Sequence, residues 1–181
     1  MIASETVEQT YTVDASHSTV EFVVRHMMIA KVRGRFAAVN GSFTVAAGER
    51  IPTRIDATID TSSIVTGDAQ RDAHLTSPDF FDIATFPQIT FTSTKIAAAD
   101  EGFALHGDLT MHGKTLPIVL DATYEGESTD PYGNRRIGFE AHGKLSRKDF
   151  GLTWNAALET GGVAVSDEVK LELSVEGVLA S

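Results

Sequence analysis

Hydrophobic and polar residues alternate along most of this chain with a period of two, the pattern of a β-strand with one buried and one solvated face. The clearest run covers residues 103–112, where apolar Phe103, Leu105, Leu109 and Met111 alternate with polar His106, Asp108, Thr110 and His112. The same alternation recurs at residues 19–25, 54–60, 118–125, 136–145 and 168–175. It predicts an all-β, antiparallel protein whose strands turn their apolar side chains toward a shared interior.

Four glycines share the parity of the inward-facing residues. Gly41, Gly107, Gly143 and Gly177 each lie two residues before an apolar side chain of the buried set. An inward-facing glycine permits sharp bending of a strand, or the close approach of another group to the backbone. The alternation alone fits a two-sheet sandwich or a closed barrel, and these glycines favour an antiparallel barrel of about eight strands. Strand curvature accounts for them even without a ligand.

Residues 62–95 interrupt the strand pattern with a short helical insert. Asp68 is placed to cap a helix of about two turns over the sequence AQRDAHL. The following SPDFF starts a second short turn before a strand resumes at residues 88–95. Arg71, Asp72 and His74 form the main polar cluster of the insert. Two roles for this cluster stay open, namely fixing the insert over one end of the barrel and meeting the head group of a ligand.

The insert, TGDAQRDAHL followed by PDFFDIATFPQITFTS, resembles the central signature of the YceI-like family of polyisoprenoid-binding, lipocalin-like barrels. VDASHSTVEFVVRH with VRGRF, then LHGDLTMHGKTLPIVL and RIGFEAHGKLSRKDFGL, resemble other strand pairs of that family in the same order. The resemblance covers residues 11–179. It implies a lipocalin-like β-barrel whose elongated apolar cavity takes the isoprenoid tail of a quinone or polyprenyl lipid. It also implies a homodimer, and an exported location for some relatives.

The leading hypothesis is therefore a non-enzymatic protein that binds, stores or transports a long apolar lipid, a polyisoprenoid or isoprenoid quinone, inside the barrel. Apolar segments of about 7 to 9 residues, at about 3.3 Å per residue, would enclose a tunnel of roughly 25 to 30 Å. The expected ligand-binding positions are inward-facing strand residues together with polar residues near one barrel mouth: Phe22, Val24, His26, Phe36, Phe43, Ile59, Arg71, His74, Phe91, Leu109, Met111, Leu120, Phe139, Leu145 and Leu173.

Two alternatives from other classes stay open. One is a small enzyme acting at the barrel mouth through His74 or His26, although no nucleophile elbow accompanies them. The other is a ligand-free, stress-related structural barrel filled by its own side chains. The histidine spacings do not match a metal site, because His106 and His112 would lie about 20 Å apart on an ordinary strand. No catalytic residue, cofactor or metal ligand is predicted.

The amino-acid composition limits the partners that the protein is expected to bind and its expected location in the cell. The net charge of −10 disfavours nucleic acid and, on average, an anionic membrane surface. The absence of cysteine excludes disulfides and thiolate catalysis. No segment resembles a signal peptide or a membrane span, which predicts a cytoplasmic protein without stable membrane insertion. No obvious cationic cluster is present for a diphosphate, which favours a neutral quinone or fatty-acyl ligand.

The chain of 181 residues is long enough to bury a sizeable core as one domain. No linker composition divides it. We expect a disordered N-terminal segment at residues 1–9 and a single barrel domain at residues 10–181.

Overall fold

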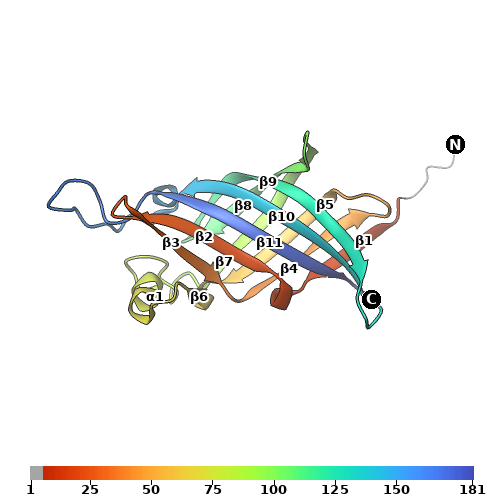
Figure 1. The fold of residues 1–181 in the computed structure, drawn as a ribbon, viewed down its shortest axis with the longest axis horizontal. Helices are drawn as coiled ribbons and strands as arrows, with labels where there is room; N and C mark the ends of the chain where they lie inside the picture. Colours follow the sequence, from red (N-terminus) through yellow and green to blue (C-terminus); the bar gives the residue numbers. More distant parts are fainter. Residues whose placement is uncertain (1–5) are drawn as a thin grey trace.

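The computed structural model describes residues 6–181, whose regular elements are mostly strands (Figure 1). The strands are β1 (Glu8–Val13), β2 (Thr19–His26), β3 (Ala30–Phe36), β4 (Val39–Ala46), β5 (Pro52–Asp60), β6 (Ile64–Val65), β7 (Gln88–Ala98), β8 (Phe103–Met111), β9 (Lys114–Thr129), β10 (Arg135–Ser146) and β11 (Glu168–Leu179). The one α-helix of the described chain is α1 (Ala69–Thr76), and short 3-10 turns span Ala15–His17, Thr61–Ser63 and Arg147–Phe150.

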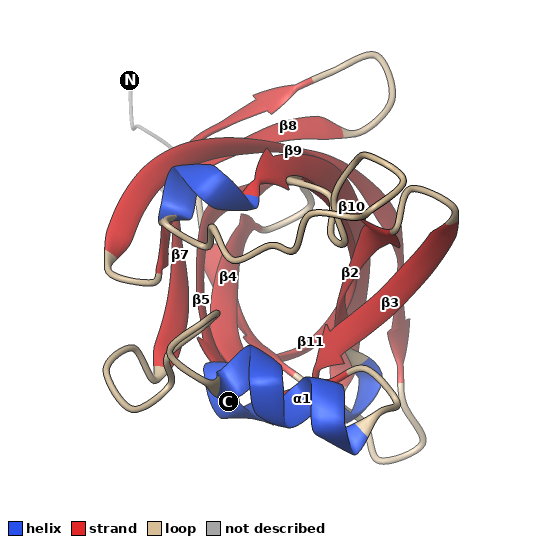
Figure 2. Ribbon diagram, turned by 90° about the vertical axis from the view of Figure 1, so that its left-hand side faces the viewer, coloured by secondary structure: helices blue, strands red, loops and turns tan. Residues whose placement is uncertain are grey.

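Eight strands close into an antiparallel ring, which confirms the predicted fold (Figure 2). Their order is β1-β4-β5-β7-β8-β9-β10-β11, and β11 pairs back onto β1 through Tyr11 opposite Leu179. The other part of the same β11 edge pairs with β2, followed by β3 and β6. Closure leaves the ring of eight without a free hydrogen-bonding edge, so the side-chain alternation of every strand decides what fills the interior.

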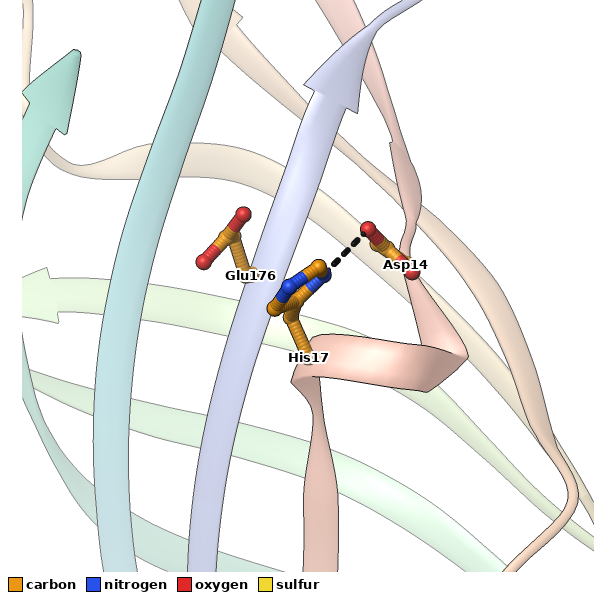
Figure 3. Close-up of side chains that lie close together, drawn as sticks. All are labelled: Asp14, His17 and Glu176. Carbon is orange, nitrogen blue, oxygen red and sulfur yellow. Dashed lines mark hydrogen bonds and ion pairs between the residues drawn. The ribbon is translucent and has the colours of Figure 1, made fainter. Parts of the chain in front are cut away.

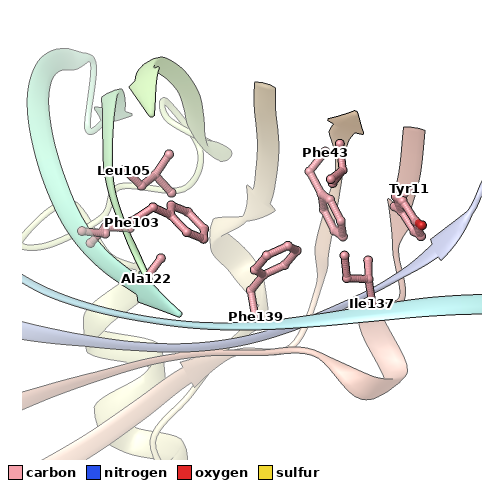
Figure 4. Packing of buried hydrophobic residues seen from close by; sticks show 9 residues of the cluster. Tyr11, Phe43, Phe103, Leu105, Ala122, Ile137 and Phe139 are labelled. Atoms are coloured by element: carbon pink, nitrogen blue, oxygen red, sulfur yellow. The ribbon is translucent and has the colours of Figure 1, made fainter. Parts of the chain in front are cut away.

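Two clusters of buried side chains lie inside the barrel. The first lies away from α1 and is centred on Phe139, whose ring meets Phe43 edge-on at a centroid distance of 5.2 Å and Phe103 at 5.8 Å (Figure 4). The second includes Phe36, Met111 and Leu152 and lies toward the α1 end. The alternation at residues 103–111 correctly predicts the inward set of β8, because Phe103, Leu105, Leu109 and Met111 are all buried.

The insert forms as its sequence predicts. Asp68 is the N-cap of α1, and its carboxylate accepts a hydrogen bond of 2.9 Å from the Arg71 backbone N–H. Asp72 reaches back to the Thr66 backbone N–H at 2.9 Å, which ties the first turn of the helix to the preceding strand end. The insert therefore lies as a fixed corner beside one end of the ring (Figure 2).

The N-terminal boundary differs from the expectation. Glu8 and Gln9 were predicted to be disordered, but they pair with Ala46 and Val45 as the first residues of β1. Their backbone hydrogen bonds leave no trace in the hydrophobic pattern, because neither side chain is apolar. Residues 1–5 of the predicted disordered segment lie outside the described residues. Within residues 6–181, no helix has the length and apolar character needed to cross a membrane.

Candidate functional site

A cavity of about 300 Å³ occupies the α1 end of the barrel. Apolar side chains make up most of its wall. They come from β2, β3, the insert, β8, β10, β11 and the loop that joins β10 to β11: Phe22, Val24, Val32, Phe36, Leu75, Phe80, Phe81, Met111, Leu145, Leu152, Trp154, Ala164, Val165, Val169 and Leu171. The polar members of the wall are Arg25, His26, Thr66, Arg71, His74 and Arg147. Arg25, His26 and Arg71 are exposed, so the cavity reaches the surface beside them.

The structure brings eight of the fifteen expected ligand-binding residues together in this cavity. These are Phe22, Val24, His26, Phe36, Arg71, His74, Met111 and Leu145. The other seven lie outside its wall, in or against the packed clusters: Phe43, Ile59, Phe91, Leu109, Leu120, Phe139 and Leu173. Alternation separates inward from outward residues, but it does not say at which height along the barrel an inward residue lies.

The predicted tunnel of roughly 25 to 30 Å needs correction. At the end away from α1 the aromatic cluster fills the interior, where Tyr11 stacks on Phe43 with ring centroids 5.4 Å apart (Figure 4). The cavity is therefore confined to one end of the barrel. Such filling is a common solution for eight-stranded barrels, whose diameter is small enough for large side chains to meet across the interior.

Arg147 is a site residue that the sequence reasoning missed. It is only 4% exposed, and its guanidinium points its donors at backbone carbonyls. Nη1 donates to the carbonyl oxygens of Leu152 and Trp154, both at 2.8 Å, and Nε donates to that of Ser166 at 2.9 Å. A signal was available, because residue 147 has the inward parity of Leu145 on β10. A charged residue in an inward position predicts a specific set of partners.

The carbonyl oxygens that accept hydrogen bonds from Arg147 all belong to the loop at residues 151–167. This buried cation therefore holds the loop across the end of the barrel, where Leu152 and Trp154 complete the cavity wall. Burial lowers the pKa of the Arg147 guanidinium, and Asp167 at 3.6 Å partly opposes that effect. The loop also joins β2, because Met27 N–H donates to the Ala164 carbonyl at 2.9 Å.

His74 links the insert to the loop. Its Nε2 lies 2.9 Å from Asp79 Oδ2, and its ring meets the rings of Phe80 and Trp154 edge-on at centroid distances of 5.1 and 4.8 Å. Arg71 is held by Thr66, whose hydroxyl and carbonyl accept from Nε and Nη2 at 2.7 and 2.8 Å. These contacts give the predicted polar cluster a structural task, closing the insert against the loop at the cavity mouth.

The charge of the cavity wall differs from the expectation. The sequence shows no cationic cluster, but Arg25, Arg71 and Arg147 all line the cavity, and its wall includes no acidic residue. These arginines are far apart in the sequence and are brought together only by closure of the barrel and the loop. Arg71 donates two hydrogen bonds and Arg147 donates four to protein oxygens, which leaves Arg25 the least constrained cation of the three.

A second polar cluster lies at the opposite end of the barrel. Asp14, His17 and Glu176 place one potential ligand atom each within 4.8 Å of one another, and His17 Nδ1 lies 2.8 Å from Asp14 Oδ2 (Figure 3). Arg136 Nη1 donates to both carboxylates at 2.7 Å. The carboxylates are therefore neutralised by a guanidinium, which is the cation that this cluster holds in the structure.

Arg136 also reaches Asp130 at 2.8 Å. The Ser16 hydroxyl, the Arg136 guanidinium and His17 hold the pKa of Asp14 well below its usual range. Arg136 has the same effect on the pKa of Asp130, and the carboxylates in turn raise the pKa of Arg136 above its usual range. This network ties β1, the β9–β10 turn and β11 together, far from the cavity.

Comparisons with known proteins agree with this architecture. The protein YceI of Salmonella newport is 38% identical over 165 residues, which cover 91% of this chain and 83% of that protein. The crystal structure of Burkholderia cenocepacia BcnA matches with a TM-score of 0.78 and 24% identity, covering 91% of this chain and 98% of that one. A polyisoprenoid binding domain from Saccharophagus degradans matches with a TM-score of 0.66 and 18% identity, covering 94% and 98%. The family described as the YceI-like domain matches residues 11–177, and the chain belongs to that family.

Proposed function

We propose that this protein binds an isoprenoid-type lipid, with part of the apolar chain held in the cavity at the α1 end of the barrel. The observation that carries the proposal is the cavity itself, which is concave, lined mainly by apolar side chains and open to the surface beside a few polar groups. That combination is typical of a site for an apolar small molecule. The name of the Saccharophagus degradans neighbour supports the choice of an isoprenoid.

Burial of the chain would supply most of the affinity. Each buried CH₂ contributes about 0.8 kcal/mol, so one isoprene unit in the cavity contributes several kcal/mol before the cost of ordering it. A volume of about 300 Å³ is at the small end for ligand sites. We therefore expect affinity to rise with the first isoprene units and then to level off, with the rest of a long tail outside the cavity or dependent on movement of the packed cluster.

A chain-length series tests this proposal. Trp154 is the single tryptophan of the chain and lines the cavity, so quenching of its fluorescence by ubiquinone analogues with increasing numbers of isoprene units reports occupancy directly. Polyprenyl phosphates of the same chain lengths show whether the cations of the cavity wall favour an anionic head group. Absence of saturable quenching with every member of both series would contradict the proposal.

A matched pair of variants locates the site. Val24→Phe places a phenyl group in the cavity, whereas Val119→Phe makes the same change at a half-exposed position on the outer wall of the barrel. We expect at least about tenfold weaker binding for Val24→Phe and no change for Val119→Phe. Equal binding by the two variants would place the ligand elsewhere.

The proposed role is storage or transport rather than catalysis. Native mass spectrometry of protein purified from its own host, with extraction of the bound molecule, identifies the natural ligand. Recovery of an added quinone with unchanged mass after prolonged incubation is the result expected of a carrier, and a product of altered mass would favour the enzyme alternative through His74 or His26. The homodimer and the cytoplasmic location stay predictions, which sedimentation and cell fractionation can test.

A further inference from the structure

The hairpin tip between β2 and β3 exposes large apolar side chains. Met28 is 60% exposed and Ile29 is 80% exposed, and Met27 and Val163 are also exposed beside them. The tip and the neighbouring loop project beyond the barrel at the end that carries α1 (Figure 1). The Met27 N–H bond to Ala164 holds Val163 next to the tip, so the four side chains form one apolar surface, which we call the tip surface.

The backbone of the tip makes this composition costly. The Ile29 N–H donates to the His26 carbonyl at 3.1 Å, and the two central residues of the turn, Met27 and Met28, have φ values of 50° and 60°. Asparagine and glycine are the residues that favour such a turn, because a side chain with φ in this range is strained. Two methionines at this place satisfy neither the turn geometry nor the usual polarity of an exposed loop. Backbone strain of this kind is found where a side chain has a functional role, such as contact with a ligand or partner.

Charge around the tip is opposite to that of the whole chain. Residues 22–36 contain Arg25, Lys31, Arg33 and Arg35 without any acidic residue, in a protein of net charge −10. Arg33 pairs with Glu172 at 2.7 Å and with Glu21 at 3.9 Å, and Arg35 lies opposite Glu21 on β2. Arg25 and Lys31 are next to the tip, and no ion pair within residues 6–181 involves either of them. The loop at residues 151–167 adds two acidic residues, Glu159 and Asp167, and Asp167 is paired with Arg147 and Lys148. Exposed apolar side chains flanked by free cations are the pattern of a surface that meets anionic lipid head groups.

The tip surface is continuous with the cavity mouth. Arg25 and His26 directly precede the tip and line the cavity, and Ala164 and Val165 do so from the loop. A surface lying against the tip would therefore lie against the opening through which an apolar ligand enters.

We propose that the tip surface docks this protein on an anionic lipid bilayer, with Met27, Met28 and Ile29 inserted at the level of the head groups and Arg25 and Lys31, which pair with each other beside the tip, contacting phosphate. The inference deepens the proposed function, on which it rests for its purpose, because docking would bring the cavity mouth to the membrane from which the lipid is collected. The proposed binding is reversible and peripheral, since three side chains insert at the level of the head groups.

Site-specific fluorescence tests the orientation. The chain has no cysteine, so Met28→Cys and Tyr132→Cys each accept one environment-sensitive label, such as a nitrobenzoxadiazole. Tyr132 is 90% exposed in the turn between β9 and β10, at the opposite end of the barrel. With vesicles of phosphatidylcholine containing about 30 mol % phosphatidylglycerol, we expect a blue shift for the label at position 28 and none at position 132. Equal shifts at both positions, or no shift at either, would overturn the inference.

Vesicle sedimentation measures the affinity. Met27→Asn/Met28→Gly removes two apolar side chains and installs the turn residues that the backbone favours, so the fold should be at least as stable while vesicle binding falls at least about tenfold. Val119→Ser, an apolar exposed residue on the barrel wall, is the matched control and should bind as the wild type does. Lys31→Gln should weaken binding about fivefold on anionic vesicles and leave the weak binding to pure phosphatidylcholine unchanged.

A comparison of quinone uptake from ethanol with quinone uptake from vesicles tests membrane docking separately from lipid binding. Met27→Asn/Met28→Gly should take up quinone normally from dilute ethanol but more slowly than the wild type from vesicles. Uptake from ethanol by the wild type without any vesicle binding would overturn the docking inference alone, and vesicle binding without uptake would overturn the lipid-binding proposal alone. A dimer in sedimentation that the same variant abolishes, with no vesicle binding, would assign the tip surface to a second copy of the chain and overturn membrane docking.

Discussion

The phenyl ring of Phe91 lies against the backbone of Gly107 on the neighbouring strand, where a Cβ on Gly107 would overlap the ring and come within 2.8 Å of the Thr92 carbonyl oxygen. The inward parity of Gly107 was predicted, and what approaches its backbone is an aromatic side chain of the protein itself. Gly34 with Phe22 and Gly177 with Phe43 repeat this arrangement. Glycines thus make room for the large rings that fill a narrow barrel.

Gly107→Ala should destabilise the fold by about 1 to 3 kcal/mol, because the new methyl group displaces the Phe91 ring in a packed interior. Urea unfolding measures the difference. Gly138→Ala is the control, since a Cβ there would meet its nearest neighbour, Glu125 Cβ, at an ordinary 3.8 Å. The two variants should therefore differ clearly, and Phe91→Leu should recover part of the loss in Gly107→Ala. Equal stability of the two alanine variants would show that the ring relaxes without cost.

Arg147→Met should loosen the loop at residues 151–167 and destabilise the protein by about 2 to 4 kcal/mol, because several buried carbonyls lose charged donors together. Amide hydrogen exchange should rise across the loop, and quinone binding at Trp154 should weaken. Lys148→Met removes the same charge from the neighbouring exposed residue, whose Nζ lies 3.0 Å from Asp167, and should change stability by less than about 1 kcal/mol. Unaltered exchange in the loop of Arg147→Met would contradict the anchoring role of Arg147.

Stability should depend on pH below the ordinary aspartate pKa through the network around Arg136. Asp14 and Asp130 have lowered pKa values in the folded protein, so their contribution is fully present above 3.8, the usual value, and is lost as the pH falls further. Arg136→Gln removes the cation that they share. Unfolding midpoints in urea should therefore differ more between this variant and the wild type at about pH 7 than at about pH 3. A difference that is independent of pH would show that Arg136 acts through packing alone.

Asp68→Ala should loosen the insert with little effect on the barrel. The lost cap costs about 1 kcal/mol locally, because the Arg71 backbone N–H loses its partner at the start of α1. Hydrogen exchange should become faster in α1 and stay unchanged in β8 and β9. Asp79→Ala, which leaves the cap intact but removes the partner of His74, should instead affect the contact with Trp154, visible in its fluorescence. Faster exchange throughout the barrel in Asp68→Ala would show that the insert is part of the cooperative core.

The sequence by itself determined the strands, their inward and outward faces, and the capped helix of the insert. Each of these follows from local rules, namely the period of two on β8 and the preference of Asp68 for a helix N-terminus. The resemblance in the insert and its flanking strands correctly identified the family. The pairing of Glu8 and Gln9 was missed, because backbone hydrogen bonds of a polar strand end have no signal in hydrophobicity.

Only the tertiary structure decided where the cavity lies and what surrounds it. Phe36 and Phe43 have the same kind of inward position, yet one lines the cavity and the other belongs to the packed cluster at the far end. Their heights along the barrel depend on the register of all eight strands, which a local pattern does not encode. For the same reason, closure brought Arg25, Arg71 and Arg147 to one cavity and gathered Asp14 and Asp130 around Arg136.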